Sequence, residues 1–130
     1  MTRLLDTNIC IAWLKRDRAV RDRLVSAPRR SLAICSVVKG ELLFGARKSS
    51  RVAENLALLS LFTAELESWP FDDAAAEHYA LLRAQAEVVR QPIGPHDLFI
   101  ASIALSRDAT LVTRNDREFR RIVGLRVEVW

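Results

Sequence analysis

The sequence of 130 residues has few cysteines, histidines, prolines and glycines: two, two, four and four. With Cys10 and Cys35 alone, a disulfide framework is disfavoured, and two buried free thiols in a reducing compartment are expected. Two histidines without cysteines at metal-ligand spacing argue against a zinc site. No repeat and no stretch rich in proline, glycine or serine interrupts the chain. We therefore expect one domain, residues 1–130.

Long apolar runs are also missing. The longest, residues 56–66, contains Ser60, Thr63 and Glu65, so it is too short and too polar to span a bilayer. Met1 leads into a charged segment rather than into the apolar core of a signal peptide. We therefore expect a cytoplasmic protein with no membrane association.

The charge balance is mildly basic, with a formal net charge of +4 and an isoelectric point near 9.7. Nearly all of the surplus is arginine. Codon bias in a GC-rich genome explains this as well as function does. The functional explanation is contact with phosphate groups, for which the planar guanidinium is well suited.

Short apolar segments alternate with helical patterns along the chain. Thr7 and Ser36 are the expected N-caps of two helices, and Pro95 suits the first turn of another. The pattern predicts strands at 3–5, 32–35, 67–71, 110–112 and 126–130, and helices at 9–15, 18–25, 37–48, 51–66, 73–89, 97–106 and 116–122. This alternation is typical of an α/β domain whose central, mostly parallel sheet is flanked by helices.

Four carboxylates lie at or near the edges of apolar segments. Asp6 ends the first strand, Glu41 interrupts an otherwise uncharged helical run, Asp97 begins a helix and Asp116 follows the fourth strand. Ligands of such sheets bind at the carboxyl ends of the strands, where Asp6, Glu41 and Asp116 fall by topology. Gathered carboxylates are costly unless a cation neutralises them. The pattern therefore favours Mg²⁺ or Mn²⁺ and a phosphodiester substrate.

Each acid also has an ordinary structural explanation. Asp6 can be a turn or capping residue, and Glu41 can pair with a nearby cation. Asp97 is favoured in a first helical turn by the helix dipole. Asp116 can form a capping box with Thr113. His96, beside Asp97, is expected to be a surface residue.

Two other phosphate-handling enzyme classes begin with an aspartate after the first strand. A haloacid-dehalogenase-type phosphatase needs a second aspartate two residues after Asp6, where Asn8 stands. A response-regulator receiver needs paired acids before its first helix and a lysine at a strand end, and neither occurs. Both classes are therefore disfavoured.

Taken together, four segments resemble the motifs of PIN-domain ribonucleases, and among these the VapC toxins of bacterial toxin–antitoxin pairs. The segments are residues 5–8, 36–45, 93–101 and 111–119, and the likeness extends over residues 4–130. Each motif is weak alone, but their order is specific. The likeness is strongest to the branch that includes enterobacterial VapC (MvpA) and FitB.

The resemblance implies a set of site residues. The metal-binding, catalytic acids would be Asp6, Glu41, Asp97 and Asp116, with Thr113, Asn8 and Asn115 in support. His96 stands where the family often has a smaller residue, and the fourth acid varies within this branch. Apart from the resemblance, Arg114 and Arg117 are candidates for contact with the RNA backbone, because they lie near these acids in the sequence.

The resemblance also implies an activity and partners. The activity would be Mg²⁺-dependent endoribonuclease cleavage, with Mn²⁺ as a substitute, of a tRNA and specifically of the anticodon stem–loop of initiator tRNA. A VapB-type antitoxin would cover the acidic groove with a peptide that inserts an arginine. The toxin would form a homodimer and a higher assembly on DNA through the antitoxin. The alternative is a catalytically weak PIN domain that binds RNA or protein, and the presence of all four acids argues against it.

Overall fold

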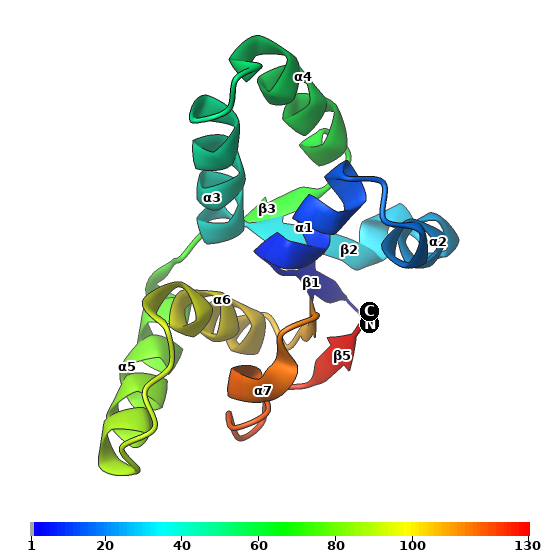
Figure 1. Ribbon diagram of the computed structural model, residues 1–130. Helices are drawn as coiled ribbons and strands as arrows, with labels where there is room; N and C mark the ends of the chain where they lie inside the picture. The colour runs from blue at the N-terminus through cyan, green and yellow to red at the C-terminus, as the bar shows by residue number, and fades with distance from the viewer. Residues whose placement is uncertain (1) are drawn as a thin grey trace.

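A computed structural model describes residues 2–130 and contains one α/β domain built on a five-stranded parallel sheet (Figure 1). The strand order is β3-β2-β1-β4-β5, and every neighbouring pair is parallel. At the centre, Leu4 of β1 pairs with Ala33 of β2 and with Leu111 of β4. The strands are β1 Arg3–Leu5, β2 Leu32–Cys35, β3 Glu67–Trp69, β4 Thr110–Thr113 and β5 Val127–Val129.

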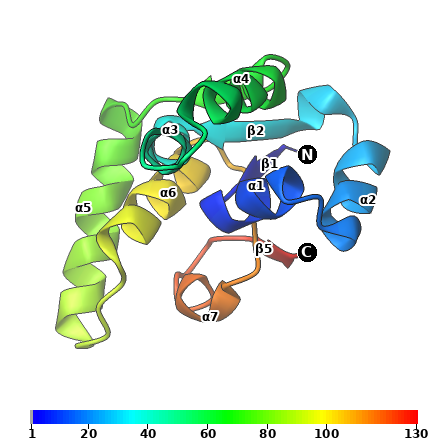
Figure 2. The ribbon, with the colours of Figure 1, turned by 45° about the horizontal axis from the view of Figure 1, so that its top comes forward.

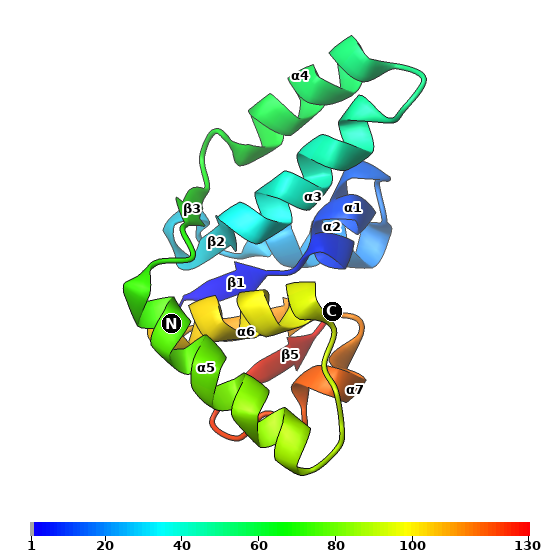
Figure 3. The same cartoon turned by 90° about the vertical axis from the view of Figure 1, so that its left-hand side faces the viewer.

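Seven α-helices connect and cover the strands. They are α1 Thr7–Leu14, α2 Arg18–Ser26, α3 Ser36–Arg47, α4 Val52–Thr63, α5 Asp73–Val88, α6 Pro95–Ser106 and α7 Asp116–Phe119, and a 3₁₀ turn spans Arg29–Ser31. The α3–α4 hairpin projects from the sheet, and α5 and α6 form a second pair (Figure 3). Helix α1 lies between the α3–α6 side and α2 (Figure 2).

The central strands are short but almost wholly buried. Every residue of β2 and β4 is buried, as are Leu4 and Leu5 of β1. Parallel strands covered by helices on both faces read as continuous apolar runs, because neither face meets water. Segment 32–35 shows this pattern fully, and segment 110–113 shows it at Leu111 and Val112, between two buried threonines.

Helix α6 is the most deeply buried helix. Ile100, Ala101, Ile103 and Ala104 are at most 1% exposed, and the buried Ser102 hydroxyl donates to the Leu98 carbonyl. Because Asp97 lies at the start of this helix, the packing of α6 against the sheet fixes where that carboxylate stands.

The structure confirms the predicted elements but corrects three predicted caps. Asp6, not Thr7, caps α1, and the Thr7 hydroxyl oxygen is buried without a hydrogen-bond partner in the described part of the chain. Cys35 rather than Ser36 precedes α3, with no side-chain cap. The predicted capping box is also absent, because Thr113 is still part of β4 and its hydroxyl is used inside the sheet edge.

The cysteines are free and buried, as predicted. Burial raises the pKa of the Cys10 thiol far above its ordinary value and that of Cys35 to about 11. Both thiols therefore stay protonated and act as small apolar side chains. No helix within residues 2–130 has the length and apolar character to cross a bilayer.

The packing of α6 can be tested with Ile103→Ala. Ile103 is 0% exposed, so the truncation removes buried methyl groups and leaves a cavity, and the free energy of unfolding should fall by about 2–5 kcal/mol. The control is Val88→Ala in α5, where Val88 is 81% exposed. Urea unfolding of both variants measures the difference. Equal stabilities would contradict the central place of α6 in the core.

Candidate active site

Asp6 lies directly after β1 and is 5% exposed. Its Oδ1 accepts the backbone N–H groups of Asn8 and Ile9 at 2.8 and 3.3 Å. These two bonds cap α1 and hold the carboxylate at the carboxyl edge of the sheet. Burial raises the pKa of the Asp6 carboxyl, the hydrogen bonds from Thr113, Ile9 and Asn8 lower it, and Glu41 raises it further.

Thr113, at the end of the neighbouring strand β4, orients the other oxygen of Asp6. Its hydroxyl donates to Asp6 Oδ2 at 2.5 Å and accepts the backbone N–H of Asn115 at 3.0 Å. Thr113 is 0% exposed, so neither bond competes with water. The side chain therefore joins two strand ends at the acidic edge, in keeping with the supporting role predicted for it.

Glu41 enters from the second turn of α3, and its side chain is 29% exposed. It is close enough to Asp6 to raise the pKa of that group. Glu41 Oε1 lies 2.9 Å from Nδ1 of His96, whose side chain is 68% exposed. His96 is therefore a surface residue, as predicted, but it also contacts a site carboxylate.

Asp97, in the first turn of α6, is the most strongly perturbed acid of the group. Its pKa is raised to about 7, first by burial, then by a hydrogen bond and charge repulsion from Glu118, and then by Asp6 and Glu41. A proton held between two carboxyl groups is the usual response to like charges without a cation. The fold thus brings Asp6, Glu41 and Asp97 close enough to repel one another, and we call this group the acidic field.

Glu118 of α7 is the fourth acid of this field, and the sequence reasoning missed it. Glu118 Oε2 accepts the Gly94 N–H at a long 3.5 Å, and a Cβ built on Gly94 would lie 3.9 Å from Asp97 Oδ2 and 4.0 Å from Glu118 Oε2. The two carboxylates therefore meet over the loop that begins α6.

Asp116 is placed differently. It pairs with Arg120 one turn later in the chain, and this hydrogen bond lowers the pKa of the Asp116 carboxyl. Asp116 is not among the groups that act most strongly on the pKa of Asp97 or Asp6. The spacing of four residues between Asp116 and Arg120 was the readable signal, because such pairs form on helix surfaces.

The predicted supporting residues Asn8 and Asn115 contribute through their backbone. The Asn8 N–H donates to Asp6, and the Asn115 N–H donates to Thr113. Both residues are exposed. Their side-chain roles stay predictions.

The donor atoms of these acids suit a hard divalent cation, although their side chains are not arranged at chelating distance. Within residues 2–130, no three histidine, cysteine or acidic side chains converge at chelating distance. All the candidate donors are carboxylate oxygens, which Mg²⁺ and Mn²⁺ prefer. A cation that replaced the proton on Asp97 would remove the repulsion that raises its pKa.

The raised pKa of Asp97 predicts an unusual pH dependence. A carboxyl whose folded pKa lies near 7 binds more protons folded than unfolded, so its contribution to stability is lost as pH rises from about 4 through 7. In metal-free buffer the melting temperature should fall between about pH 5 and pH 8. Asp97→Asn should flatten this profile and raise stability at pH 8.

Mg²⁺ added at pH 8 should stabilise the wild type more than Asp97→Asn. Parallel profiles for the two proteins would contradict the assignment.

Comparisons with known proteins identify the family of the chain. The PIN domain family model matches residues 3–125. The tRNA(fMet)-specific endonuclease VapC of Shigella flexneri is 41% identical over 98% of this chain and 96% of its own length.

Two solved structures are similar over their whole length. VapBC2 from Rickettsia felis, bound to a DNA fragment from its promoter, superposes with a TM-score of 0.93 at 38% identity, covering 100% of this chain and 99% of that one. DNA-bound VapBC from Salmonella typhimurium gives 0.93 and 38%, with 100% and 98% covered. The predicted resemblance is confirmed: the chain belongs to the PIN-domain family and, within it, to the VapC ribonucleases.

Proposed function

We propose that this chain is the toxin of a VapBC toxin–antitoxin pair and hydrolyses RNA with a divalent cation, Mg²⁺ or Mn²⁺, held by Asp6, Glu41, Asp97 and Glu118. The observation that carries the proposal is the electrostatic coupling of these four carboxylates at the carboxyl edge of the sheet. Asp116, the fourth ligand predicted from the sequence, is the alternative to Glu118 in this role.

The side chains at the site have different roles in the proposed hydrolysis. When bound, the cation lowers the pKa of a ligated water to supply hydroxide near neutral pH and offsets charge on the phosphate. Thr113 and the start of α1 hold Asp6 in one orientation. Asp97, whose pKa is raised by burial and by Glu118 when no cation is present, would lose its proton to the solvent on serving as a ligand. With water as the nucleophile and the 3′ oxygen as the leaving group, the P–O3′ bond would break and O3′ would take up a proton, so the products would carry 5′-phosphate and 3′-hydroxyl ends.

A tRNA is the proposed substrate, specifically initiator tRNA cut in its anticodon stem–loop. Support comes from the relative in Shigella flexneri, which is named a tRNA(fMet)-specific endonuclease. Such recognition would use the shape and the exposed loop bases of the RNA. The cytoplasmic location predicted from the sequence places the protein beside this substrate.

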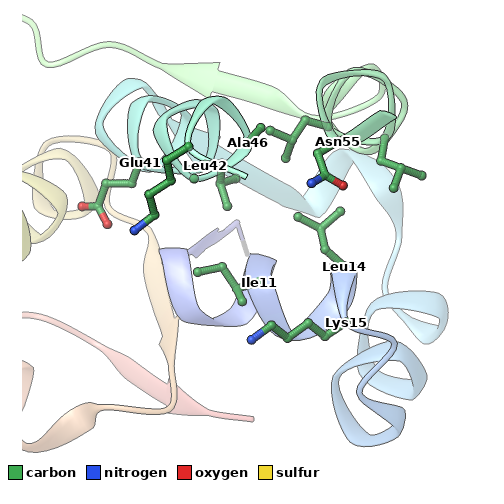
Figure 4. A pocket seen from close by; sticks show the side chains of 11 residues that line it. Ile11, Leu14, Lys15, Glu41, Leu42, Ala46 and Asn55 are labelled. Carbon is green, nitrogen blue, oxygen red and sulfur yellow. The ribbon is translucent and has the colours of Figure 1, made fainter. Parts of the chain in front are cut away.

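A VapB-type antitoxin is the proposed partner, as in the VapBC complexes that this fold resembles. A cavity of about 490 Å³ lies between α1, α3 and α4 (Figure 4). Ile11 and Leu14 face Leu42 and Ala46 across it, and Glu41 stands at one end. An apolar antitoxin segment in this groove would therefore reach the acidic site and could place an arginine against Glu41. The homodimer and the DNA-bound assembly stay predictions.

Controlled expression tests the function. The wild type should arrest growth and produce one dominant cut RNA with a 5′-phosphate at the cut, whereas Asp6→Ala should do neither. A 2′,3′-cyclic phosphate product would contradict hydrolysis by water. Equal arrest by both proteins would point to a mechanism outside the acidic site, and RNA binding without turnover would favour the non-catalytic alternative.

The identity of the fourth acid is tested by Glu118→Gln and Asp116→Asn. Both substitutions keep the side-chain shape, and both residues lie in α7. Glu118→Gln should lower kcat for cleavage of an initiator tRNA transcript at least about 100-fold, as expected for loss of about 2.7 kcal/mol of transition-state stabilisation. Asp116→Asn should change it less than about threefold. A larger loss of kcat in Asp116→Asn than in Glu118→Gln would identify Asp116 as the fourth acid.

The antitoxin groove is tested by Leu58→Asp, with Leu61→Asp in the same helix as the control. Leu58 lines the cavity, whereas the more exposed Leu61 does not. A carboxylate in an apolar interface loses solvation, so Leu58→Asp should weaken antitoxin binding at least about tenfold, or about 1.4 kcal/mol. Leu61→Asp should leave it unchanged, and both should still cleave RNA. Calorimetric titration with the antitoxin gives the comparison, and equal affinities would place the antitoxin elsewhere.

A further inference from the structure

The positive charge of the chain is concentrated at the turn between α1 and α2. Residues 15–23 contain five basic and two acidic side chains, a surplus of three in a chain whose whole surplus is four. These seven are Lys15, Arg16, Asp17, Arg18, Arg21, Asp22 and Arg23. The turn is therefore one of the places where positive charge is in local surplus.

A second stretch, residues 114–126, has the same surplus but uses most of its charge internally. Four of its five arginines pair with carboxylates: Arg114 with Asp17, Arg120 with Asp116, Arg121 with Glu118 and Arg126 with Asp108. In contrast, none of Arg16, Arg18 and Arg21 forms an ion pair within residues 2–130. The turn between α1 and α2 thus presents guanidinium groups without carboxylate partners, of which that of Arg21 lies over the Trp13 ring at 5.7 Å from its centroid.

These three arginines line one hollow of about 500 Å³, together with Asp22 and Val25. All five residues are exposed, and Val25 is the one apolar residue among them. A protein segment or a membrane surface needs apolar anchors, which this hollow does not offer. Arginines without apolar anchors fit a polyanion, and their planar forks suit phosphate oxygens.

The hollow is tied to the acidic site by direct contacts. Arg114, which follows Thr113, donates to Asp17 Oδ1 at 2.8 Å, and Asp17 caps α2. Asp6 begins α1 and Arg16 follows its end, so the eight residues of α1 separate them by about 12 Å. Figure 2 shows α1 running from the strand ends toward the turn before α2. A nucleic-acid strand whose phosphate lies at Asp6 would reach the hollow within a few nucleotides.

Two features of the turn oppose local stability. Arg16 has a φ of 61°, a left-handed conformation that glycine adopts without strain. Arg18 occupies the first turn of α2, where the helix dipole disfavours a cation. Arg16 and Arg18 are therefore not explained by the folding of the turn.

We propose that Arg16, Arg18 and Arg21 form an RNA-backbone surface that holds the substrate while its scissile phosphate lies at the acidic site. The inference rests on the proposed ribonuclease function. The side chains contact phosphates flanking the cut, so they set affinity and orientation and leave the chemical step to the carboxylates.

The test measures RNA binding in an Asp97→Asn background, where cleavage is disabled. The probe is an initiator tRNA transcript, titrated between about 0.05 and 0.2 M salt. Replacing Arg16, Arg18 and Arg21 together by alanine should weaken binding at least about tenfold and reduce the salt slope by about one per arginine. In the catalytically intact chain the same triple variant should raise KM and leave kcat unchanged.

A matched control removes three arginines elsewhere. Arg30, Arg47 and Arg90 are exposed, form no ion pair within residues 2–130 and lie in the 3₁₀ turn, in α3 and after α5, so their replacement by alanine makes the same change in net charge. Equal loss of RNA affinity in both triple variants would overturn the surface, because charge alone would then explain it. Weaker antitoxin binding with unchanged RNA binding would also overturn it. If the Asp97→Asn parent bound no RNA and the wild type cut none, the proposed function itself would fail.

Arg16→Gly separates binding from folding, with Arg90→Gly as its control. Arg90 also has a positive φ, 54°, at the end of α5. Both substitutions relieve the left-handed backbone, so neither should lower the melting temperature. Arg16→Gly should weaken RNA binding about threefold or more, whereas Arg90→Gly should not. Equal RNA affinity of the two glycine variants would contradict the role of Arg16.

Discussion

The hydrogen bond from the Thr113 hydroxyl to Asp6 Oδ2 joins the ends of the two central strands, β4 and β1. The opposite oxygen of Asp6 caps α1, so one buried carboxylate fixes a strand end, a helix start and a neighbouring strand. The remaining acids are arranged around this point: Glu41 on α3 acts on Asp6, and Asp97 on α6 feels both. If Asp6 turned away, α1 would lose its cap and the acidic edge its anchor.

The clustering of carboxylates that suits a cation site also lowers the stability of the folded protein. Burial and mutual repulsion raise the pKa of Asp97 to about 7, so part of the site holds a proton at neutral pH when no cation is bound. A binding site whose charges repel one another is stabilised by the ligand that neutralises them. The same repulsion that weakens the folded state favours a divalent cation and, through it, a phosphodiester.

Helix α1 borders two surfaces near the site, one mostly apolar and one basic. The cavity between α1, α3 and α4 is mostly apolar and ends at Glu41, whereas the turn after α1 is basic and exposed. An antitoxin segment and an RNA backbone would therefore reach the same carboxylates from different sides of α1. On this proposal, inhibition by the antitoxin would need no change of fold, because occupancy of the carboxyl edge of the sheet would be enough to exclude the RNA.

The sequence by itself determined the strands, the helices and the acids Asp6, Glu41 and Asp97, because buried parallel strands and strand-end carboxylates leave local patterns. Family resemblance added the order of the motifs. The tertiary structure decided which acid of α7 faces the site. Asp116 and Glu118 are two residues apart in a one-turn helix, and the rotation of that turn directs Asp116 to Arg120 and Glu118 to Asp97. The tertiary structure also decided the hydrogen bond of Thr113. Its hydroxyl donates to Asp6 instead of forming a capping box, because Thr113 lies in β4 at the buried edge of the sheet. The placements of Glu118 and of the Thr113 hydroxyl could not be predicted from spacing, since their partners Asp97 and Asp6 lie 21 and 107 positions away in the chain. The pairing of Asp116 with Arg120, four residues apart, is the part that spacing could indicate.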